Sequence, residues 1–560
     1  MTDGSKTTFL QRRFPSLQSM DLSRDIPAGL IVAVILAPQA MAYALLAGLP
    51  PITGLYAATV PLVAYVLLGS SRQLAVGPVA LVSLLVQVAC STVAQPGTAA
   101  YTEAALQLAL LSGLILLLLA VCRAGFLVNF LSRAAIGGFT SAAAIIIGLS
   151  QLKHLLGVAA GGGESALHLA KELGRHLHEF HPLTAGIGVC SILLLLLLQR
   201  FFPRLPAPLF VVAAATLLTG LFGLDQGGVS TVGGLPHGLP PLSVPRWSPE
   251  LLGTLFPPAA TIAVVGYLES FAVADLISVR EKYRIDPNRE LGGLGLSNLA
   301  AALFSGYPVT GGFSRTAVNH RAGARSGLAS FVTAIIILAI LLWFTSLFHY
   351  LPKAALAAIV MVAVAGLLEV EEARKLFRIK KSDGFTFLLT FLATLGMGVE
   401  AGIAAGVVFS LLVFIWRSAH PHIAELGWLP DEKVFRNIGR YPDARSFPGF
   451  LLVRIDASLY FANMAFVADW LRERIARRDD VHWIILDMSG VNDMDAVALS
   501  ALERDMETMA ERGIRIACAG MKGPVRDLVE RAGWPQRYGR IMSFLSVQEA
   551  VAELGQHSWQ

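Results

Sequence analysis

Long apolar runs separated by short polar segments fill residues 26–418, and this pattern ends near residue 430. Stretches such as LALLSGLILLLLAV and ASFVTAIIILAILLWF belong to runs long enough to cross a bilayer as helices. About fourteen such spans can be counted, some of them short or interrupted by Gly and Pro. We therefore expect a polytopic α-helical membrane domain over residues 26–420.

The pattern after residue 430 is that of a soluble α/β domain. The stretch FLLVRIDASLYFAN is typical of a strand, and FVADWLRERIARR is typical of a helix. WIILDMSGVNDMDAVALSALERDMETMAERG predicts a strand, a loop and a helix, and RIACAG predicts one more strand. This alternation predicts a small α/β domain over residues 430–555.

Composition supports the same division. The chain is 55% hydrophobic and 15% charged, and residues 430–560 hold 36 of its 83 charged residues. Charged side chains are costly in hydrocarbon and needed on a soluble surface, so the change marks a change of solvent. No nucleotide-binding loop, nucleophile elbow or metal constellation is present, so we predict no enzyme activity, no cofactor and no metal site. The excess of Lys and Arg over acidic residues is explained by the membrane topology described next, so we expect no nucleic-acid partner.

The distribution of Lys and Arg predicts the orientation. With fourteen spans and a cytoplasmic N-terminus, the inner loops collect 21 Lys and Arg residues and the outer loops only five. This matches the positive-inside rule and puts the C-terminal domain in the cytoplasm. Residues 1–25 are polar and basic and do not resemble a cleaved signal, so we expect them to form a cytoplasmic segment. The expected location is the inner membrane of a bacterium, with lipid around the spans.

Two segments, residues 72–92 and 305–325, break the pattern of a simple span. The first contains Gly77-Pro78, and the second contains SGYPVTGGFSRTAVNHRAGA where another span is due. They are the third spans of two halves of about seven spans each, and paired interruptions of this kind point to a site at mid-membrane. Helices that start there present unpaired N–H groups and positive dipole ends to an anion.

Several motifs resemble those of the sulfate permease family, which includes prestin and the other members of solute carrier family 26. These motifs are PQAMAYALLAGLPPITGLYAA, GSSRQLAVGPVALVSLL, YLESFAVAD and GYPVTGGFSRTAVNHRAG, in the family's order. The resemblance implies a uracil-permease-like fold of seven plus seven inverted spans, in which a core slides against a gate in an elevator-like movement. It also implies transport of small anions, a homodimer and a C-terminal STAS domain.

Arg315 is the strongest candidate for anion binding, because a charged residue inside a span is costly and usually functional. A guanidinium can donate two parallel hydrogen bonds to an oxyanion. The alternative is a structural Arg bonded to nearby carbonyls. By resemblance, Ser314 and Arg315 begin the second half-helix and face the anion. The other expected substrate contacts are the neighbouring residues Gly77, Pro78, Val79, Gly312 and Phe313, together with Ser270, for which simple packing is equally plausible.

Glu269 is the one acid near the middle of a span. A carboxylate beside an anion would repel it unless protonated, so we predict that Glu269 carries a coupling proton. The alternative is a salt bridge to Arg315 or Arg72 that holds the fold. Gln39 and Tyr43 lie four residues apart on one helical face and are expected to line the substrate cavity, or else to form a helix–helix hydrogen bond.

These features lead to a predicted function. We expect a secondary active transporter of small inorganic oxyanions, with sulfate favoured and H⁺ as the coupling ion. The alternatives are a sodium-coupled bicarbonate carrier, a dicarboxylate carrier and an uncoupled anion channel. A membrane-anchored scaffold does not explain the paired half-helices. In the STAS-like domain, Asp495-Ala496 lacks the phosphorylatable Ser found in related regulators, which favours docking of a cytosolic protein or an assembly role.

Overall fold

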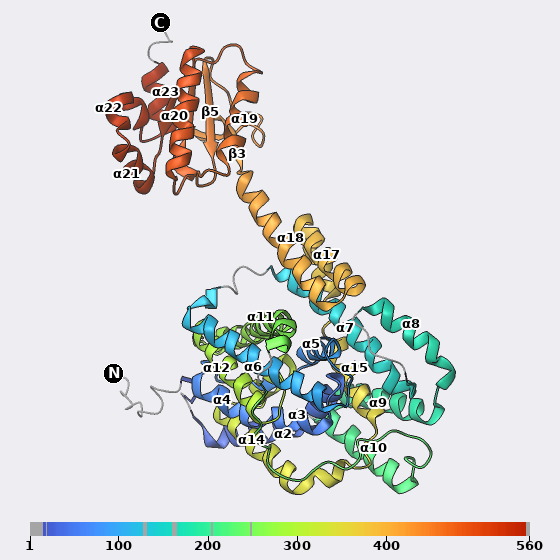
Figure 1. Ribbon diagram of the computed structural model, residues 1–560. Helices are drawn as coiled ribbons and strands as arrows, with labels where there is room; N and C mark the ends of the chain where they lie inside the picture. Colours follow the sequence, from blue (N-terminus) through green and yellow to red (C-terminus); the bar gives the residue numbers. More distant parts are fainter. Residues whose placement is uncertain are drawn as a thin grey trace. The chain divides into compact units, whose positions relative to one another are not determined.

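The computed structural model describes residues 15–17, 20–126, 132–159, 165–202, 205–246 and 249–555 of the 560-residue chain. The N-terminal segment expected over residues 1–25 lies largely outside the described residues. The chain forms two compact units, one ending at Ser410 and one beginning at Leu411 (Figure 1).

The first unit is built almost entirely of helices, as expected for a chain whose backbone groups must be satisfied within lipid. Within the described residues, nine helical segments are long and apolar enough to cross a membrane. They comprise α2 (Leu22–Leu46), α3 with α4 (Pro51–Ala57, Val60–Leu68), α6 (Ala99–Val121), α7 (Arg133–Leu156), α9 (Pro182–Phe201), α11 (Pro249–Arg280), α14 with its extension (Leu328–Phe348), α15 with α16 (Lys353–Ala365, Val370–Ile379) and α18 (Val399–Ala419).

Shorter helices complete this unit: α5 (Ala80–Ser91), α8 (Ala166–His176), α10 (Ala207–Phe222), α12 (Pro287–Leu303), α13 (Phe313–Arg321) and α17 (Lys381–Met397). The expectation of a multi-pass helical membrane domain is confirmed, whereas the count of fourteen spans stays a prediction.

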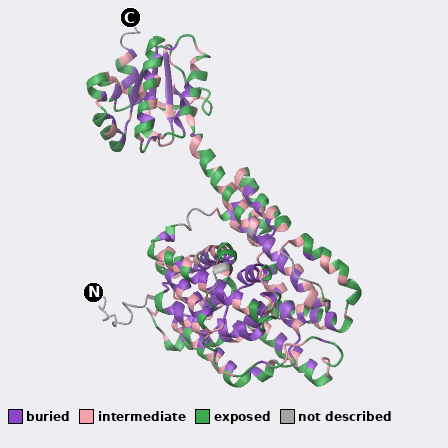
Figure 2. Cartoon of the chain, viewed as in Figure 1, coloured by how far each residue is buried: buried purple, intermediate pink, exposed green. Residues whose placement is uncertain are grey.

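Many helices of the first unit have apolar outer faces. The large side chains that are more than half exposed include Leu118, Leu193, Leu217, Leu221 and Trp343. Figure 2 shows exposed positions along many of these helices. An apolar surface of this extent is unfavourable in water and suits contact with lipid tails.

The helices of the first unit pack as two groups. In the first group, α2–α6 pack with α11–α14, and in the second, α7–α10 pack with α15–α17. Small residues allow close packing within the first group. A Cβ atom on Gly113 of α6 would lie 2.9 Å from the carbonyl oxygen of Gly295 of α12. The two groups meet where α2 contacts α10 and α15 and where α5 contacts α7.

The second unit contains a five-stranded sheet in the order β4-β3-β5-β6-β7. The strands are β3 (Ile423–Leu429), β4 (Val434–Asn437), β5 (Phe450–Ile455), β6 (Trp483–Asp487) and β7 (Arg515–Ala519). β5, β6 and β7 are parallel, and β3 is antiparallel to both of its neighbours. In register, Leu451 pairs with Ile484, and Ile484 pairs with Ile516.

Helices cover both faces of this sheet. The helices are α19 (Met464–Ile475), α20 (Ala496–Glu511), α21 (Gly523–Arg531), α22 (Trp534–Tyr538) and α23 (Val547–Gly555). Leu451 and Val453 of β5 face α19 and α20, whereas Phe450 and Leu452 face α23. The alternation follows from the two-residue period of a strand, so both faces of β5 are buried.

The predicted strands and helices of this unit agree with β5, α19, β6, α20 and β7. The structure adds the hairpin of β3 and β4, which the sequence pattern did not indicate. β3 begins at Ile423, before residue 430, where the charge content changes.

Candidate functional site

Two short strands from distant parts of the chain meet inside the first unit. β1 (Val76–Gly77) and β2 (Thr310–Gly311) pair antiparallel, with Val76 opposite Gly311 and Gly77 opposite Thr310. Each strand leads into a short helix, α5 of 12 residues and α13 of nine. At 1.5 Å per residue these helices are roughly 18 and 14 Å long, about half the hydrocarbon thickness or less. Both helices are therefore too short to cross the bilayer alone, which agrees with the interruptions expected in these two segments.

The first turns of both helices carry free backbone donors. The N-cap residues are Val79 for α5 and Gly312 for α13, and neither helix has a side-chain cap. The first N–H groups of a helix have no partner inside the helix, and the dipole makes this end positive. Gly77 has a φ of 154°, a conformation that favours glycine and that turns the chain sharply before α5.

The guanidinium of Arg315 links α13 to the chain between β1 and α5. Its side chain is 2% exposed, and Nη1 donates a hydrogen bond of 2.6 Å to the carbonyl oxygen of Pro78. A Cβ atom on Gly312 would lie 2.8 Å from Cζ of Arg315, and one on Gly77 would lie 3.4 Å from Nη2. The two glycines therefore provide the space that the guanidinium occupies.

Two donors of this guanidinium are unsatisfied. Nε and Nη2 of Arg315 are shielded from solvent and have no hydrogen-bond partner in the described structure. No described Asp or Glu forms an ion pair with Arg315. Leaving buried, charged donors unpaired is costly, so the arrangement suits an acceptor that binds from outside the chain.

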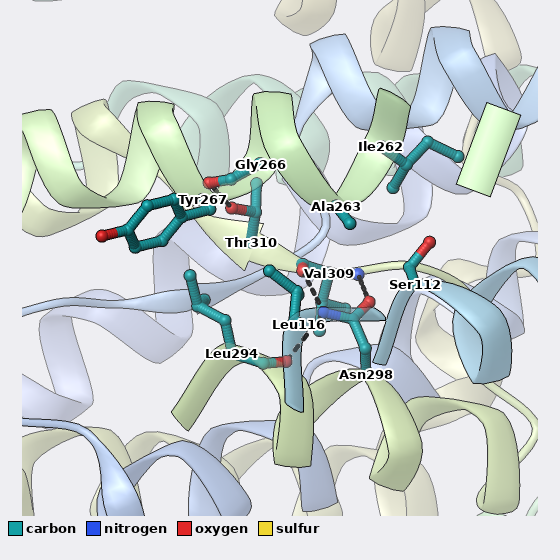
Figure 3. Close-up of a pocket in the computed structure, with 10 residues that line it drawn as sticks. All are labelled: Ser112, Leu116, Ile262, Ala263, Gly266, Tyr267, Leu294, Asn298, Val309 and Thr310. Atoms are coloured by element: carbon teal, nitrogen blue, oxygen red, sulfur yellow. Dashed lines mark hydrogen bonds between the residues drawn. The ribbon is translucent and has the colours of Figure 1, made fainter. Parts of the chain in front are cut away.

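Side chains of α11 and α12 hold β2 in place (Figure 3). The amide of Asn298 accepts from the N–H of Val309 and donates to its carbonyl oxygen, both at 2.9 Å. Thr310 Oγ1 donates to the carbonyl oxygen of Gly266, and Ser270 Oγ accepts from the N–H of Gly311 at 2.7 Å. The Ser270 hydroxyl therefore bonds to β2.

Side chains of α13 hold the segment before β1. Thr316 Oγ1 accepts from the N–H of Ala75 at 3.1 Å, and Asn319 Nδ2 donates to the carbonyl oxygen of Gln73 at 2.9 Å. The N–H of Gly312 also donates to the carbonyl oxygen of Ala75. Each strand is thus fixed by helices from the second half of the chain, which makes β1, β2, α5 and α13 one connected element.

A buried carboxylate anchors the start of the same segment. Glu290 is fully buried and accepts from Tyr65 Oη at 2.7 Å and from the hydroxyl of Ser70 at 2.7 Å. It also accepts from the N–H groups of Ser70 and Ser71. These four hydrogen bonds satisfy the carboxylate, which explains how a charged group is tolerated there.

Gln39 and Tyr43 lie on α2 near this element. Both side chains are buried, and neither has a hydrogen-bond partner among the described residues. Tyr43 is close enough to Arg315 and Glu269 to interact with both electrostatically. Pro38 precedes Gln39 and cannot donate the backbone hydrogen bond of a regular helix, so α2 is locally weakened beside the site.

Glu269 lies one residue before Ser270 on α11. Its Oε2 atom is shielded from solvent and has no hydrogen-bond partner in the described structure. The salt bridge to Arg315 that sequence reasoning left open is not formed, although the two side chains interact electrostatically. The carboxyl group therefore lacks the donors that would stabilise its ionised form.

A cavity of about 840 Å³ opens next to this element. From the first helix group it is lined by α2, including Gln39, and by α13, including Ser314 and Arg321. From the second group it is lined by α9, by the start of α10 and by α15. The cavity thus runs between the two groups, from the start of α13 to its end.

The structure brings the main predicted residues together. Gly77, Pro78, Gly312, Ser314 and Arg315 surround the starts of α5 and α13, and Phe313 is exposed beside them. Sequence reasoning missed the side chains that hold the strands, such as Asn298, Thr310 and Thr316. The signal was weak: Asn298 is one polar residue in GLGLSNLAAAL, where an ordinary helix–helix contact is an equally good explanation.

Comparisons with known proteins agree over nearly the whole chain. The model of the sulfate permease family matches residues 22–390, and that of the STAS domain matches residues 441–550. "Sulfate transporter 4.1, chloroplastic" of Arabidopsis thaliana is 40% identical over 545 residues, covering 94% of this chain and 79% of that protein. A probable sulfate transporter of Mycobacterium tuberculosis is 36% identical, covering 96% of each chain.

Solved structures share the fold. Murine solute carrier 26 family member A9, an anion transporter solved in the inward-facing state, matches with a TM-score of 0.89 at 25% identity, covering 99% of this chain and 96% of that chain. The transmembrane domain of the cyanobacterial bicarbonate transporter BicA matches with a TM-score of 0.60 at 20% identity, covering 71% of this chain and 98% of that domain.

Proposed function

Because this chain belongs to the sulfate permease family, a family of membrane transporters and not of enzymes, we propose that it carries small oxyanions by secondary active transport, with sulfate as its main substrate. The observation that carries the proposal is Arg315, a buried guanidinium with two unpaired donors beside the free N-termini of α5 and α13. An oxyanion at this point would accept hydrogen bonds from both nitrogens and from backbone N–H groups.

The relatives favour sulfate over bicarbonate. The proteins that are 36–40% identical are named as sulfate transporters, whereas the bicarbonate transporter is only 20% identical. A dianion with four oxygens also makes fuller use of two helix N-termini and a guanidinium than a monoanion does. Bicarbonate, dicarboxylates and uncoupled anion conduction are the alternatives.

We further propose that Glu269 couples transport to protons. Its unpaired Oε2 favours a neutral carboxyl group when an anion occupies the site, because a second negative charge nearby would repel the substrate. An anion that neutralises Arg315 removes the positive charge that stabilises ionised Glu269, so anion and proton binding support each other.

The movement proposed is a displacement of the first helix group against the second. The hydrogen bonds that join β1, β2, α11, α12 and α13 favour movement of the site as one body. The cavity extends towards the start of α2 and the end of α13, and we assign this side to the cytoplasm because the predicted topology puts most Lys and Arg residues there. This assignment places both termini in the cytoplasm and makes the conformation inward-facing. A homodimer, with the STAS domain in assembly or docking, completes the proposal.

Transport by the purified full chain in liposomes tests this function. Labelled sulfate, bicarbonate, oxalate and chloride are compared with an imposed pH gradient, a sodium gradient or neither. We expect sulfate uptake driven by an acidic exterior, lost in Arg315→Ala and largely lost in Arg315→Lys, with Arg325→Gln as the control. Absence of anion flux in the folded wild type, or normal uptake in Arg315→Ala, would refute the proposal.

A further inference from the structure

The cavity between the helix groups has mostly apolar walls. Of the 19 described residues that line it, Arg321 is the one with a charged side chain, and Gln39, Gln199 and Ser314 are the polar ones. Ser314, Val318 and Arg321 follow one another at intervals of four and three residues, so they lie on one face of α13. This face connects the binding element to the mouth of the cavity.

The guanidinium of Arg321 has no ion-pair partner among the residues that the structure describes. Its Nε donates to the carbonyl oxygen of Ala317 at 3.3 Å, and no described carboxylate forms an ion pair with it. Its neighbours differ, because His320 and Arg325 both contact Glu281, at 2.8 and 3.5 Å. The exposed guanidinium of Arg321 therefore keeps its Nη donors for a ligand in the cavity.

The position of Arg321 suits an intermediate point on the anion's path. Six residues of helix separate it from Arg315, which corresponds to roughly 9 Å along the axis of α13. Apolar walls concentrate the field of a single charge and raise the local concentration of an oppositely charged solute. An anion that leaves the site along α13 would meet Ser314 first and Arg321 at the mouth.

We propose that Arg321 forms a second, weaker anion subsite that captures small oxyanions at the mouth of the cavity and passes them to the site at Arg315. The inference rests on the proposed function, because it assumes that an anion crosses this cavity. A purely structural role is the alternative, since a cation in the last turn also stabilises a helix dipole. That role would affect the two directions of transport alike.

Sided transport measurements separate these roles. The full chain is assayed in inside-out and right-side-out membrane vesicles with labelled sulfate at low and high ionic strength. For Arg321→Gln we expect an increase of about tenfold in the apparent KM for sulfate presented from the cavity side, with an unchanged maximal rate. From the opposite side the KM should stay at the wild-type value. Arg321→Lys should remain close to wild type, and Arg321→Glu should be worse than Arg321→Gln.

Arg325→Gln is the matched control, because this residue follows the same helix but contacts Glu281 and does not line the cavity. Its sulfate KM should not change from either side. Equal changes from both sides in Arg321→Gln, a KM that matches wild type, or a difference that salt does not reduce would overturn the subsite. A wild type without anion flux would instead refute the proposed function, and this inference with it.

Discussion

Replacing Gly312 by Ala tests whether the proposed anion site depends on the position of the Arg315 guanidinium and not only on its charge. The added Cβ atom would lie 2.8 Å from both Cζ and Nη2 of Arg315. The φ of Gly312 is −91°, so alanine fits the backbone without strain. The conflict is with the end of a flexible side chain, so we expect the protein to fold and the guanidinium to move.

The magnitude follows from the contacts that the guanidinium makes. Displacement would break its 2.6 Å bond to Pro78 and turn its free donors away from the anion. A hydrogen bond to a charged group contributes about 1.5–3 kcal/mol, and each 1.4 kcal/mol is a factor of about ten in affinity. We therefore expect Gly312→Ala to weaken sulfate binding by roughly 10- to 100-fold.

Equilibrium binding of labelled sulfate to the purified full chain measures this loss. Gly148→Ala is the control, because an added Cβ atom on this α7 residue meets nothing within 4 Å. In an Arg315→Ala background, Gly312→Ala should weaken sulfate binding by less than about 0.5 kcal/mol further, because both changes remove the same interaction. Wild-type affinity in Gly312→Ala, or fully additive losses, would show that the site does not depend on where the guanidinium lies.

Three further changes test other parts of the molecule. Glu269→Gln should still exchange sulfate for sulfate but lose accumulation driven by an acidic exterior; pH-driven uptake equal to wild type would contradict the proton role. Deletion of residues 430–560 should leave sulfate binding within about threefold of wild type, because the proposed site lies in the first unit; complete loss of binding in a folded truncation would show that the site is not there. In the soluble unit, Arg478 and the N–H of Gly449 lower the pKa of Asp480 from 3.8 to about 2. Ionised Asp480 therefore stabilises this unit above pH 4, and this stabilisation is lost as the pH falls towards 2. Asp480→Asn should accordingly speed hydrogen exchange of the Gly449 N–H strongly at pH 7 and less at pH 3.

The sequence predicted those parts of the fold that have a local signal. A long apolar run has few alternatives to a membrane helix, and the alternation in FLLVRI is the pattern of β5. Gly77-Pro78 and the glycines before Arg315 interrupt such runs, so the half-helices could be located as well. The hairpin of β3 and β4 gave no comparable signal, because IAELGWL and VFRN are short, mixed in polarity and close to a membrane span.

The contacts that shape the site could not be predicted, because they join residues far apart in sequence. Arg315 and Pro78 are separated by 237 positions, and Thr316 and Ala75 by 241. A lone Asn or Thr in an apolar helix is compatible with many partners, so the roles of Asn298 and Thr316 had no unique sequence signature. The side on which the cavity opens could not be predicted from the sequence either, because a transporter adopts its inward-facing and outward-facing states with the same residues.

The pairing of β1 with β2 has a consequence for how the protein is made. At a synthesis rate of about 5–20 residues per second, Arg315 leaves the ribosome roughly 12–47 s after Pro78, from which it is 237 residues distant. During that time the extended backbone around Gly77 has no strand to pair with, and unpaired peptide groups are costly in lipid. Until the second half of the chain has been made, the peptide groups around Gly77 must therefore be satisfied by water, by the translocation machinery or by a chaperone. A ribosome that stalls between α6 and α11 would leave an inserted fragment with an unfinished site and an unpaired strand edge, and such an edge can pair with other chains.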